Sequence, residues 1–190
     1  LLLCKGYAAA ELVAIIACLR VGAVFVPVDT SCSIHHASRI VSIARQCKPV
    51  CSIIVSNDPE RADEDPMLLL LAQKETNIHR YVVLTSDLSL PMPNDINIEH
   101  DLQGIHPTYQ QHPQQQREKS PMYIMYTSGT TGAPKGVIGT EIGLINRIMW
   151  QYRNYPYTES DIVCRRTPLA FIDALAEMFA PLLNEECTIL

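Results

Sequence analysis

A short stretch in the second half of the sequence, residues 124–136, concentrates side chains that are able to bind an anion. An apolar run, Ile-Met-Tyr, is followed there by Thr-Ser-Gly-Thr-Thr-Gly-Ala-Pro-Lys-Gly. Glycines let a backbone approach an anion and take positive φ angles. Backbone N–H groups and hydroxyls then donate to phosphate oxygens, and a lysine adds positive charge. The stretch predicts a polyphosphate-binding loop made of Thr127, Ser128, Gly129, Thr130, Thr131, Gly132, Lys135 and Gly136.

The spacing within this loop differs from that of the common nucleotide-binding loop. The Walker pattern needs a glycine directly before its lysine and a serine or threonine directly after it. Here Pro134 precedes Lys135 and Gly136 follows it, which argues against a P-loop NTPase or kinase. The alternative without chemistry is a flexible Ser/Thr/Gly turn between two strands. The density of hydroxyls, followed by Pro-Lys-Gly, favours phosphate binding.

Two strands are expected to hold the loop. Ile124–Tyr126 end an apolar run before it, and Val137–Gly139 continue as a strand after it. Strands that flank a tight glycine-rich loop form a hairpin. Thr140 can then cap a helix that runs to about Tyr152, and Glu141 in its first turn suits the helix dipole.

Helical and extended patterns alternate along the rest of the chain. Segments with a helical apolar period are Glu11–Arg20, Ile34–Gln46, Met67–Glu75 and Phe171–Leu183. Short apolar runs typical of strands are Ala23–Val28, Val50–Val55, Arg80–Thr85, Ile162–Arg165 and Cys187–Leu190. Since continuous apolar runs are typical of strands covered on both faces, the alternation predicts an α/β fold with a mostly parallel sheet flanked by helices.

The apolar positions within these helices predict core residues. Gly22 is expected to end the first helix. On that helix the expected inward residues are Leu12, Ile15, Ile16 and Leu19. On the second they are Ile40, Val41 and Ile43, and on the last they are Leu175, Phe179, Leu182 and Leu183.

Composition narrows the functional class. The 190 residues are 47% hydrophobic and 18% charged, which is a globular balance. A net charge of −5 without a basic run gives no reason to expect nucleic acid binding, and Leu1–Leu3 is too short for a membrane span. The seven cysteines lack zinc-site spacing. We therefore expect mostly buried free thiols in a reducing, intracellular compartment, the cytoplasm.

Residues 86–120 lack sustained periodicity and are rich in glutamine, so we expect a mobile surface loop. His100, His106 and His112 lie in or beside it without carboxylate or thiolate partners at ligand spacing. We therefore expect solvated histidines and no metal site.

Thr127–Gly136 resemble the signature of the adenylate-forming (AMP-binding) superfamily, which includes acyl-CoA synthetases, adenylation domains of non-ribosomal peptide synthetases, and luciferases. Leu19–Asp29 is similar to an earlier family block, in which a helix ends in Gly-Ala and a strand ends in Pro-x-Asp. The family usually continues with two prolines and an arginine, where this chain has Thr30, Ser33 and His36. Together these features look most like the branch of β-alanine-activating and plant acyl-activating enzymes.

Phe171–Leu183 is similar to the next family block. In amino-acid-activating members an aspartate directly follows the phenylalanine and binds the substrate amino group. Here Ile172 takes that place and Asp173 comes one residue later. Phe171 and Asp173 are therefore candidate substrate-binding residues, and the alternative for Asp173 is a carboxylate that only stabilises a helix start.

The resemblance implies ATP-dependent activation of a carboxylic or amino acid, followed by transfer to the thiol of CoA or of a carrier-protein phosphopantetheine. The loop would hold the β- and γ-phosphates. The catalytic lysine of the family lies in a C-terminal domain, so the resemblance places no catalytic residue in this chain. The ligand of Mg²⁺ is likewise expected beyond residue 190.

The chain starts on Leu1 and stops within an apolar run, so we expect residues 1–190 to be an incomplete N-terminal part of an AMP-binding domain, without the C-terminal domain. Alone it is expected to be inactive. Two alternatives remain open, a non-catalytic nucleotide-binding module and a truncated product without function.

Overall fold

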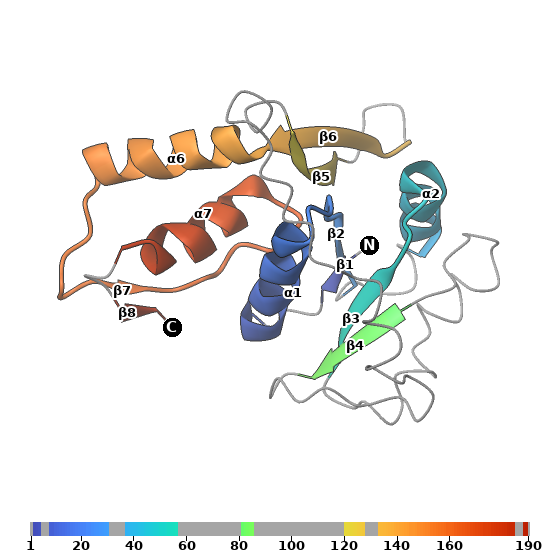
Figure 1. The fold of residues 1–190 in the computed structure, drawn as a ribbon, viewed down its shortest axis with the longest axis horizontal. Helices are drawn as coiled ribbons and strands as arrows, with labels where there is room; N and C mark the ends of the chain where they lie inside the picture. The colour runs from blue at the N-terminus through green and yellow to red at the C-terminus, as the bar shows by residue number, and fades with distance from the viewer. Residues whose placement is uncertain are drawn as a thin grey trace.

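The computed structural model describes residues 2–4, 8–30, 37–56, 81–85, 120–127, 133–184 and 188–189. Its larger sheet consists of four parallel strands in the order β2-β1-β3-β4 (Figure 1). These strands are β1 (Leu2–Cys4), β2 (Pro27–Asp29), β3 (Ser52–Ser56) and β4 (Tyr81–Thr85). Helix α1 (Ala8–Arg20) connects β1 to β2, and α2 (Ala37–Cys47) lies between β2 and β3 in the chain. The predicted α/β fold with a mostly parallel sheet is confirmed.

The second half of the chain adds a hairpin and two long helices. Strands β5 (Pro121–Thr127) and β6 (Lys135–Thr140) pair antiparallel, as predicted. Helix α6 (Glu141–Asn154) follows β6 directly and lies beside α7 (Ile172–Leu182) (Figure 1). The short strands β7 (Ile162–Val163) and β8 (Thr188–Ile189) form a parallel pair.

The ends of α1 and α6 confirm two local predictions. Gly22 has a φ of +69°, and its N–H donates to the Leu19 carbonyl while that of Ala23 donates to the Cys18 carbonyl. This pair of bonds is a Schellman motif, which glycine favours because it lacks a Cβ atom. At α6, the Thr140 hydroxyl accepts the Gly143 N–H at 3.3 Å and caps the helix.

Strand β5 is covered on both faces. Tyr123 and Met125 belong to the larger core, whereas Tyr126 belongs to a second core, because side chains alternate across a strand. Phe25 joins the hairpin to the segment before β2 through an isolated parallel bridge to Tyr123. Its N–H donates to the Met122 carbonyl and its carbonyl accepts the Ile124 N–H. The hairpin is thereby fixed to the rest of the fold.

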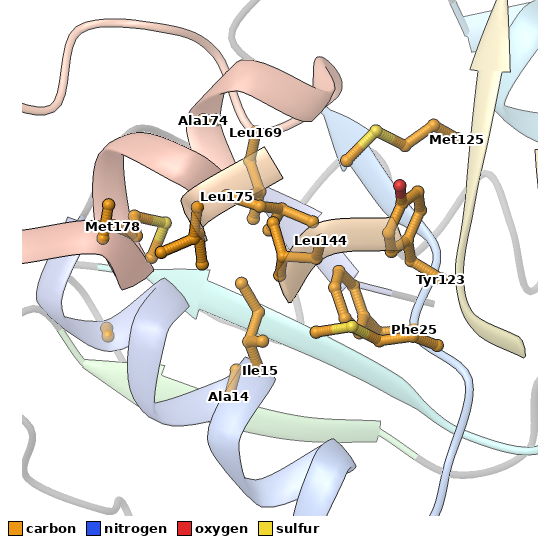
Figure 2. Packing of buried hydrophobic residues seen from close by; sticks show 14 residues of the cluster. Ala14, Ile15, Phe25, Tyr123, Met125, Leu144, Leu169, Ala174, Leu175 and Met178 are labelled. Atoms are coloured by element: carbon orange, nitrogen blue, oxygen red, sulfur yellow. The ribbon is translucent and has the colours of Figure 1, made fainter. Parts of the chain in front are cut away.

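The larger core lies between α1, α6, α7 and β5. Figure 2 shows Ile15, Leu144 and Leu175 meeting in this space, with Phe25 and Tyr123 beside them. The second core lies between α2, β2 and β5 and contains Val26, Val28, Ile40, Val41, Ile43, Ala44 and Tyr126. The three apolar residues predicted for the second helix are therefore buried, as expected.

The prediction that a residue faces the core is wrong at three positions. Ile16 is 40% exposed, Leu182 is 44% exposed and Leu183 is 65% exposed. On α1 the buried stripe runs through Ala10, Glu11, Ala14 and Ile15, which turns Ile16 away because neighbours along a helix differ by about 100°. On α7, small residues such as Ala174 and Ala180 face the core. The positions of its large apolar side chains therefore did not identify the buried face of this helix.

Several boundaries also differ from the predictions. Helix α1 begins at Ala8. Strand β2 covers Pro27–Asp29, so only its first two residues overlap the predicted strand Ala23–Val28. Val50 lies outside β3 and is 89% exposed. Strand β6 is longer than predicted and begins at Lys135. The predicted helix at residues 67–75, and residues 86–119 of the expected mobile loop, lie outside the described residues.

Candidate phosphate-binding site

The two strands of the hairpin place the ends of the predicted phosphate loop opposite each other. Thr127, the last residue of β5, is the register partner of Lys135, the first residue of β6. The Thr127 hydroxyl lies 3.5 Å from the Lys135 carbonyl oxygen, a distance at which a hydrogen bond is weak. The remaining predicted loop residues, Ser128, Gly129, Thr130, Thr131 and Gly132, lie outside the described residues.

We call the open end of the hairpin, where Thr127 and Lys135 lie opposite each other, the hairpin mouth. Close packing next to it requires a glycine at position 136. A Cβ atom at this position would lie 2.9 Å from Cγ2 of Ile124 and 3.2 Å from Cζ of Tyr126. Contacts this short would push the two β5 side chains away. Gly136 therefore allows β6 to lie close to β5 at the residue after Lys135.

Lys135 is exposed, and within the described ranges no carboxylate pairs with its ammonium group. An exposed lysine at the mouth of a hairpin, with three N–H donors, fits a phosphate ligand. The side chains at this mouth are thus a hydroxyl and a cation, both of which suit the anionic end of a nucleotide.

Helix α2 contacts β5 and the residue directly before β6. Nη2 of Arg39 donates to the Tyr126 carbonyl at 2.9 Å, and Nε2 of Gln46 donates to the Pro134 carbonyl at 3.3 Å. No pattern in the sequence indicates this contact of Arg39. A helix-period pattern identifies the inner face of a helix, but it carries no signal for a bond from a cation to a strand far along the chain.

The two candidate substrate residues lie at the start of α7. Phe171 is the N-cap residue and is 61% exposed. Asp173 pairs with Arg147 of α6 at 3.7 Å, and the two side chains are 65% and 38% exposed. No hydrogen bond or ion pair within the described part of the chain connects either residue to the hairpin mouth. A role in substrate binding stays a prediction for both.

Comparison with known proteins identifies the family of this chain. The model of the AMP-binding enzyme family matches residues 8–190. The chain belongs to this family. Its signature residues Thr127 and Lys135 therefore lie at the mouth of a hairpin in an AMP-binding domain, and the resemblance inferred from the sequence is confirmed.

The chain is similar in sequence to parts of two much longer synthetases. This AMP-binding chain is 28% identical over 171 residues to the vanchrobactin synthetase VabF of Vibrio anguillarum, which covers 90% of the chain and 5% of that protein. It is 43% identical over 61 residues to the β-alanyl-bioamine nonribosomal peptide synthetase ebony of Drosophila melanogaster, covering 32% of the chain and 7% of ebony.

Among solved structures, ATP-bound MatB from Rhodopseudomonas palustris superposes with a TM-score of 0.68 at 18% identity. The match covers 100% of the AMP-binding chain and 34% of MatB. The matches therefore cover a third of this structure, 5% of VabF and 7% of ebony. At this identity the likeness concerns the fold.

A second polar centre of the AMP-binding chain joins α1 to the segment before α7. Nη2 of Arg165 lies 2.8 Å from Oε2 of Glu11, and the two side chains are 9% and 0% exposed. Glu177 of α7 accepts the N–H groups of Arg166 and Thr167 at 2.9 and 2.8 Å. Its other oxygen accepts the Thr167 hydroxyl at 2.5 Å. Sequence reasoning missed this centre because its charges come from distant segments.

The environment of Glu177 lowers its pKa. Burial alone raises the pKa, but the bonds from the Thr167 hydroxyl and from the Thr167 and Arg166 N–H groups, with the nearby Arg165 charge, outweigh it. Hydrogen bonds and a cation favour the ionised carboxylate. Glu177 therefore remains a charged acceptor that holds the backbone between β7 and α7.

Four cysteines within the described residues, Cys18, Cys47, Cys51 and Cys164, are free thiols. Burial raises the pKa of Cys18 and Cys47, which disfavours their thiolates. Cys164 is exposed rather than buried, because it follows the short β7 instead of lying within the longer strand that was predicted.

Neither a metal centre nor a membrane segment is found in the part of the chain that the structure describes. No three His, Cys, Asp or Glu side chains there are grouped so that they could hold a metal ion. None of the helices there combines the length and apolar character that crossing a bilayer requires.

Proposed function

We propose that this chain serves in the ATP-dependent activation of a carboxylic or amino acid. In the first step a carboxylate oxygen attacks the α-phosphorus of ATP, a new O–P bond forms, and the bond to pyrophosphate breaks. In the second step a thiol sulfur attacks the acyl carbon, and AMP leaves with the electron pair of the broken C–O bond. The thiol belongs to CoA or to a carrier-protein phosphopantetheine.

One observation carries this proposal, the hairpin mouth of an AMP-binding domain with Thr127 and Lys135 in register. The first step transfers a nucleotidyl group, so catalysis depends on positioning and on stabilising charge on the phosphates. A threonine hydroxyl and an exposed ammonium group, which has no carboxylate partner among the described residues, can do both. Ser128, Thr130 and Thr131 would add further donors, and Gly129 and Gly132 would allow backbone N–H groups to reach the phosphate oxygens.

The other parts of the reaction remain predictions. Mg²⁺ would neutralise phosphate charge, and its protein ligand is expected beyond residue 190, as is the catalytic lysine. The acid is proposed to be a carboxylic or amino acid. The likeness to ebony makes β-alanine a substrate to test. Free thiols at four cysteines support a reducing compartment inside the cell as the location.

The test is carboxylate-dependent exchange of labelled pyrophosphate into ATP, measured on the full natural chain across a panel of acids that includes β-alanine. The variant is the double substitution Thr130→Ala, Lys135→Ala. The matched control is Arg153→Ala, which removes an exposed cation in the last turn of α6. Loss of a charged donor should raise the KM for ATP by roughly tenfold or more.

Exchange that depends on one acid and is weakened only in the double variant would support the proposal and name the substrate class. ATP binding without exchange for any acid would instead favour a non-catalytic nucleotide-binding module. Neither binding nor exchange would favour a product without function.

A further inference from the structure

Two residues of α2, Arg39 and Gln46, are hydrogen-bonded to the two ends of the hairpin mouth. Arg39 lies in the first turn and Gln46 in the last turn of this helix. They are seven residues apart, or two helical turns, so they lie on one face about 10 Å from each other. One contacts β5 and the other contacts the residue before β6. A single rigid helix therefore spans the mouth.

The two acceptors occupy equivalent places in the chain. Tyr126 directly precedes Thr127, and Pro134 directly precedes Lys135. The carbonyl of one residue and the N–H of the next belong to the same planar unit and point in opposite directions. By holding the Tyr126 carbonyl, Arg39 therefore fixes the peptide unit that leads into Thr127, and Gln46 fixes the one that leads into Lys135.

Packing strengthens the contact on the Arg39 side. The Tyr126 side chain is 9% exposed and lies in the core formed with Ile40, Val41 and Ala44 of α2. The bond from Arg39 to the Tyr126 carbonyl is partly buried, whereas that from Gln46 is exposed. A bond from a charged donor is stronger than one between neutral groups. Arg39 is therefore the stronger of the two contacts.

We infer that Arg39, assisted by Gln46, is a positioning residue that sets the direction of the backbone and side chains at Thr127 and Lys135 for ATP phosphates. This inference rests on the proposed function. Arg39 acts through the hairpin strand and is not assigned a contact with substrate.

The test compares Arg39→Ala, Arg39→Lys and Gln46→Met in the full natural chain, with Ser42→Ala as the matched control. Ser42 is on the same helix, and its hydroxyl donates within that helix, to the Ser38 carbonyl at 2.8 Å. Pyrophosphate exchange gives the KM for ATP, the KM for the acid and kcat. A merely structural role for Arg39 would lower the amount of active protein and hence the apparent kcat, and it would leave the KM for ATP unchanged.

Arg39→Ala should raise the KM for ATP about tenfold, which corresponds to about 1.4 kcal/mol, while the KM for the acid stays within about twofold. Arg39→Lys keeps a cationic donor and should lie between wild type and Arg39→Ala. Gln46→Met should raise the KM for ATP about twofold, since its bond is exposed and neutral. If Arg39→Ala does not fold, Arg39→Lys and Gln46→Met decide the question.

An unchanged KM for ATP in Arg39→Lys and Gln46→Met, together with an unchanged value or a fall in kcat alone in Arg39→Ala, would overturn the inference. If the wild type shows no exchange with any acid, the proposed function fails, and ATP affinity by calorimetry becomes the readout. Weaker ATP binding in Arg39→Ala, with Ser42→Ala unchanged, would then still support the positioning role. Equal affinity, or no ATP binding by the wild type, would overturn it.

Discussion

The hairpin mouth and the polar centre between α1 and the segment before α7, which contains Glu11, Arg165 and Glu177, both contain charged side chains, but in opposite environments. We call this polar centre the junction. At the mouth, the Lys135 ammonium is exposed and, within the described residues, has no carboxylate partner. At the junction, Glu11 and Arg165 are buried and paired with each other. A buried charge without a partner is costly, whereas an exposed one is solvated. The difference indicates that the junction supports the fold, and the exposed ammonium group supports the proposal that the mouth binds a phosphate ligand.

Breaking the junction is expected to have the largest effect on stability. Glu11→Ala leaves the buried guanidinium of Arg165 without its carboxylate, which should lower the free energy of unfolding by about 3–5 kcal/mol. Chemical denaturation of the full natural chain measures this loss. The double variant Glu11→Leu, Arg165→Met should recover most of it, because neither buried charge then remains. A single variant within about 0.5 kcal/mol of wild type would contradict the role given to the pair.

The packing of the hairpin depends on a glycine, Gly139, which leaves room for the Tyr123 side chain. A Cβ atom at Gly139 would lie 1.8 Å from Cζ of Tyr123, so Gly139→Ala should lower the free energy of unfolding by about 1–3 kcal/mol. Gly143→Ala is the matched control, because its Cβ atom would lie 3.4 Å from the Thr140 hydroxyl oxygen, which is close to an ordinary van der Waals contact. Alanine in this helix should be neutral or stabilising by up to about 1 kcal/mol. Equal losses in both variants would refute the packing argument.

A smaller effect concerns the pH dependence of stability at the junction. The lowered pKa of Glu177 means that its contribution is present above the pKa of the unfolded chain and is lost as pH falls through the folded pKa. Glu177→Gln cannot titrate, so wild type should lose stability more steeply than this variant between roughly pH 5 and pH 3. Unfolding midpoints measured across that range provide the comparison. Parallel curves would show that Glu177 is not held as described.

The same contrast explains how much could be predicted from the sequence. The hairpin and the Thr140 cap were predictable because the residues that form them lie close together in the chain. The phosphate-binding role of the glycines, hydroxyls and lysine at the mouth stays a prediction. The Glu11–Arg165 pair and the contact of Arg39 with Tyr126 join segments far apart in the chain. Periodicity assigns a glutamate such as Glu11 to solvent, so neither contact had a local signal.

The orientation of helix faces was only partly predictable for a related reason. Ile15 and Ile16 are identical side chains in adjacent positions, yet one is buried and the other is 40% exposed. Their places are decided by where Leu144 and Leu175 lie in the folded chain (Figure 2). On α7 the alanines face the core because the neighbouring helix α6 lies close, which a scale based on residue size does not anticipate.

The most direct test of the proposed activity follows the oxygen atoms of the acid. The full natural chain is incubated with ATP, Mg²⁺, a thiol acceptor and an accepted acid labelled with oxygen-18 in its carboxylate. If the carboxylate attacks the α-phosphorus, mass spectrometry should find one labelled oxygen in the phosphate of AMP. Label in orthophosphate, or an unlabelled AMP formed together with product, would contradict the account.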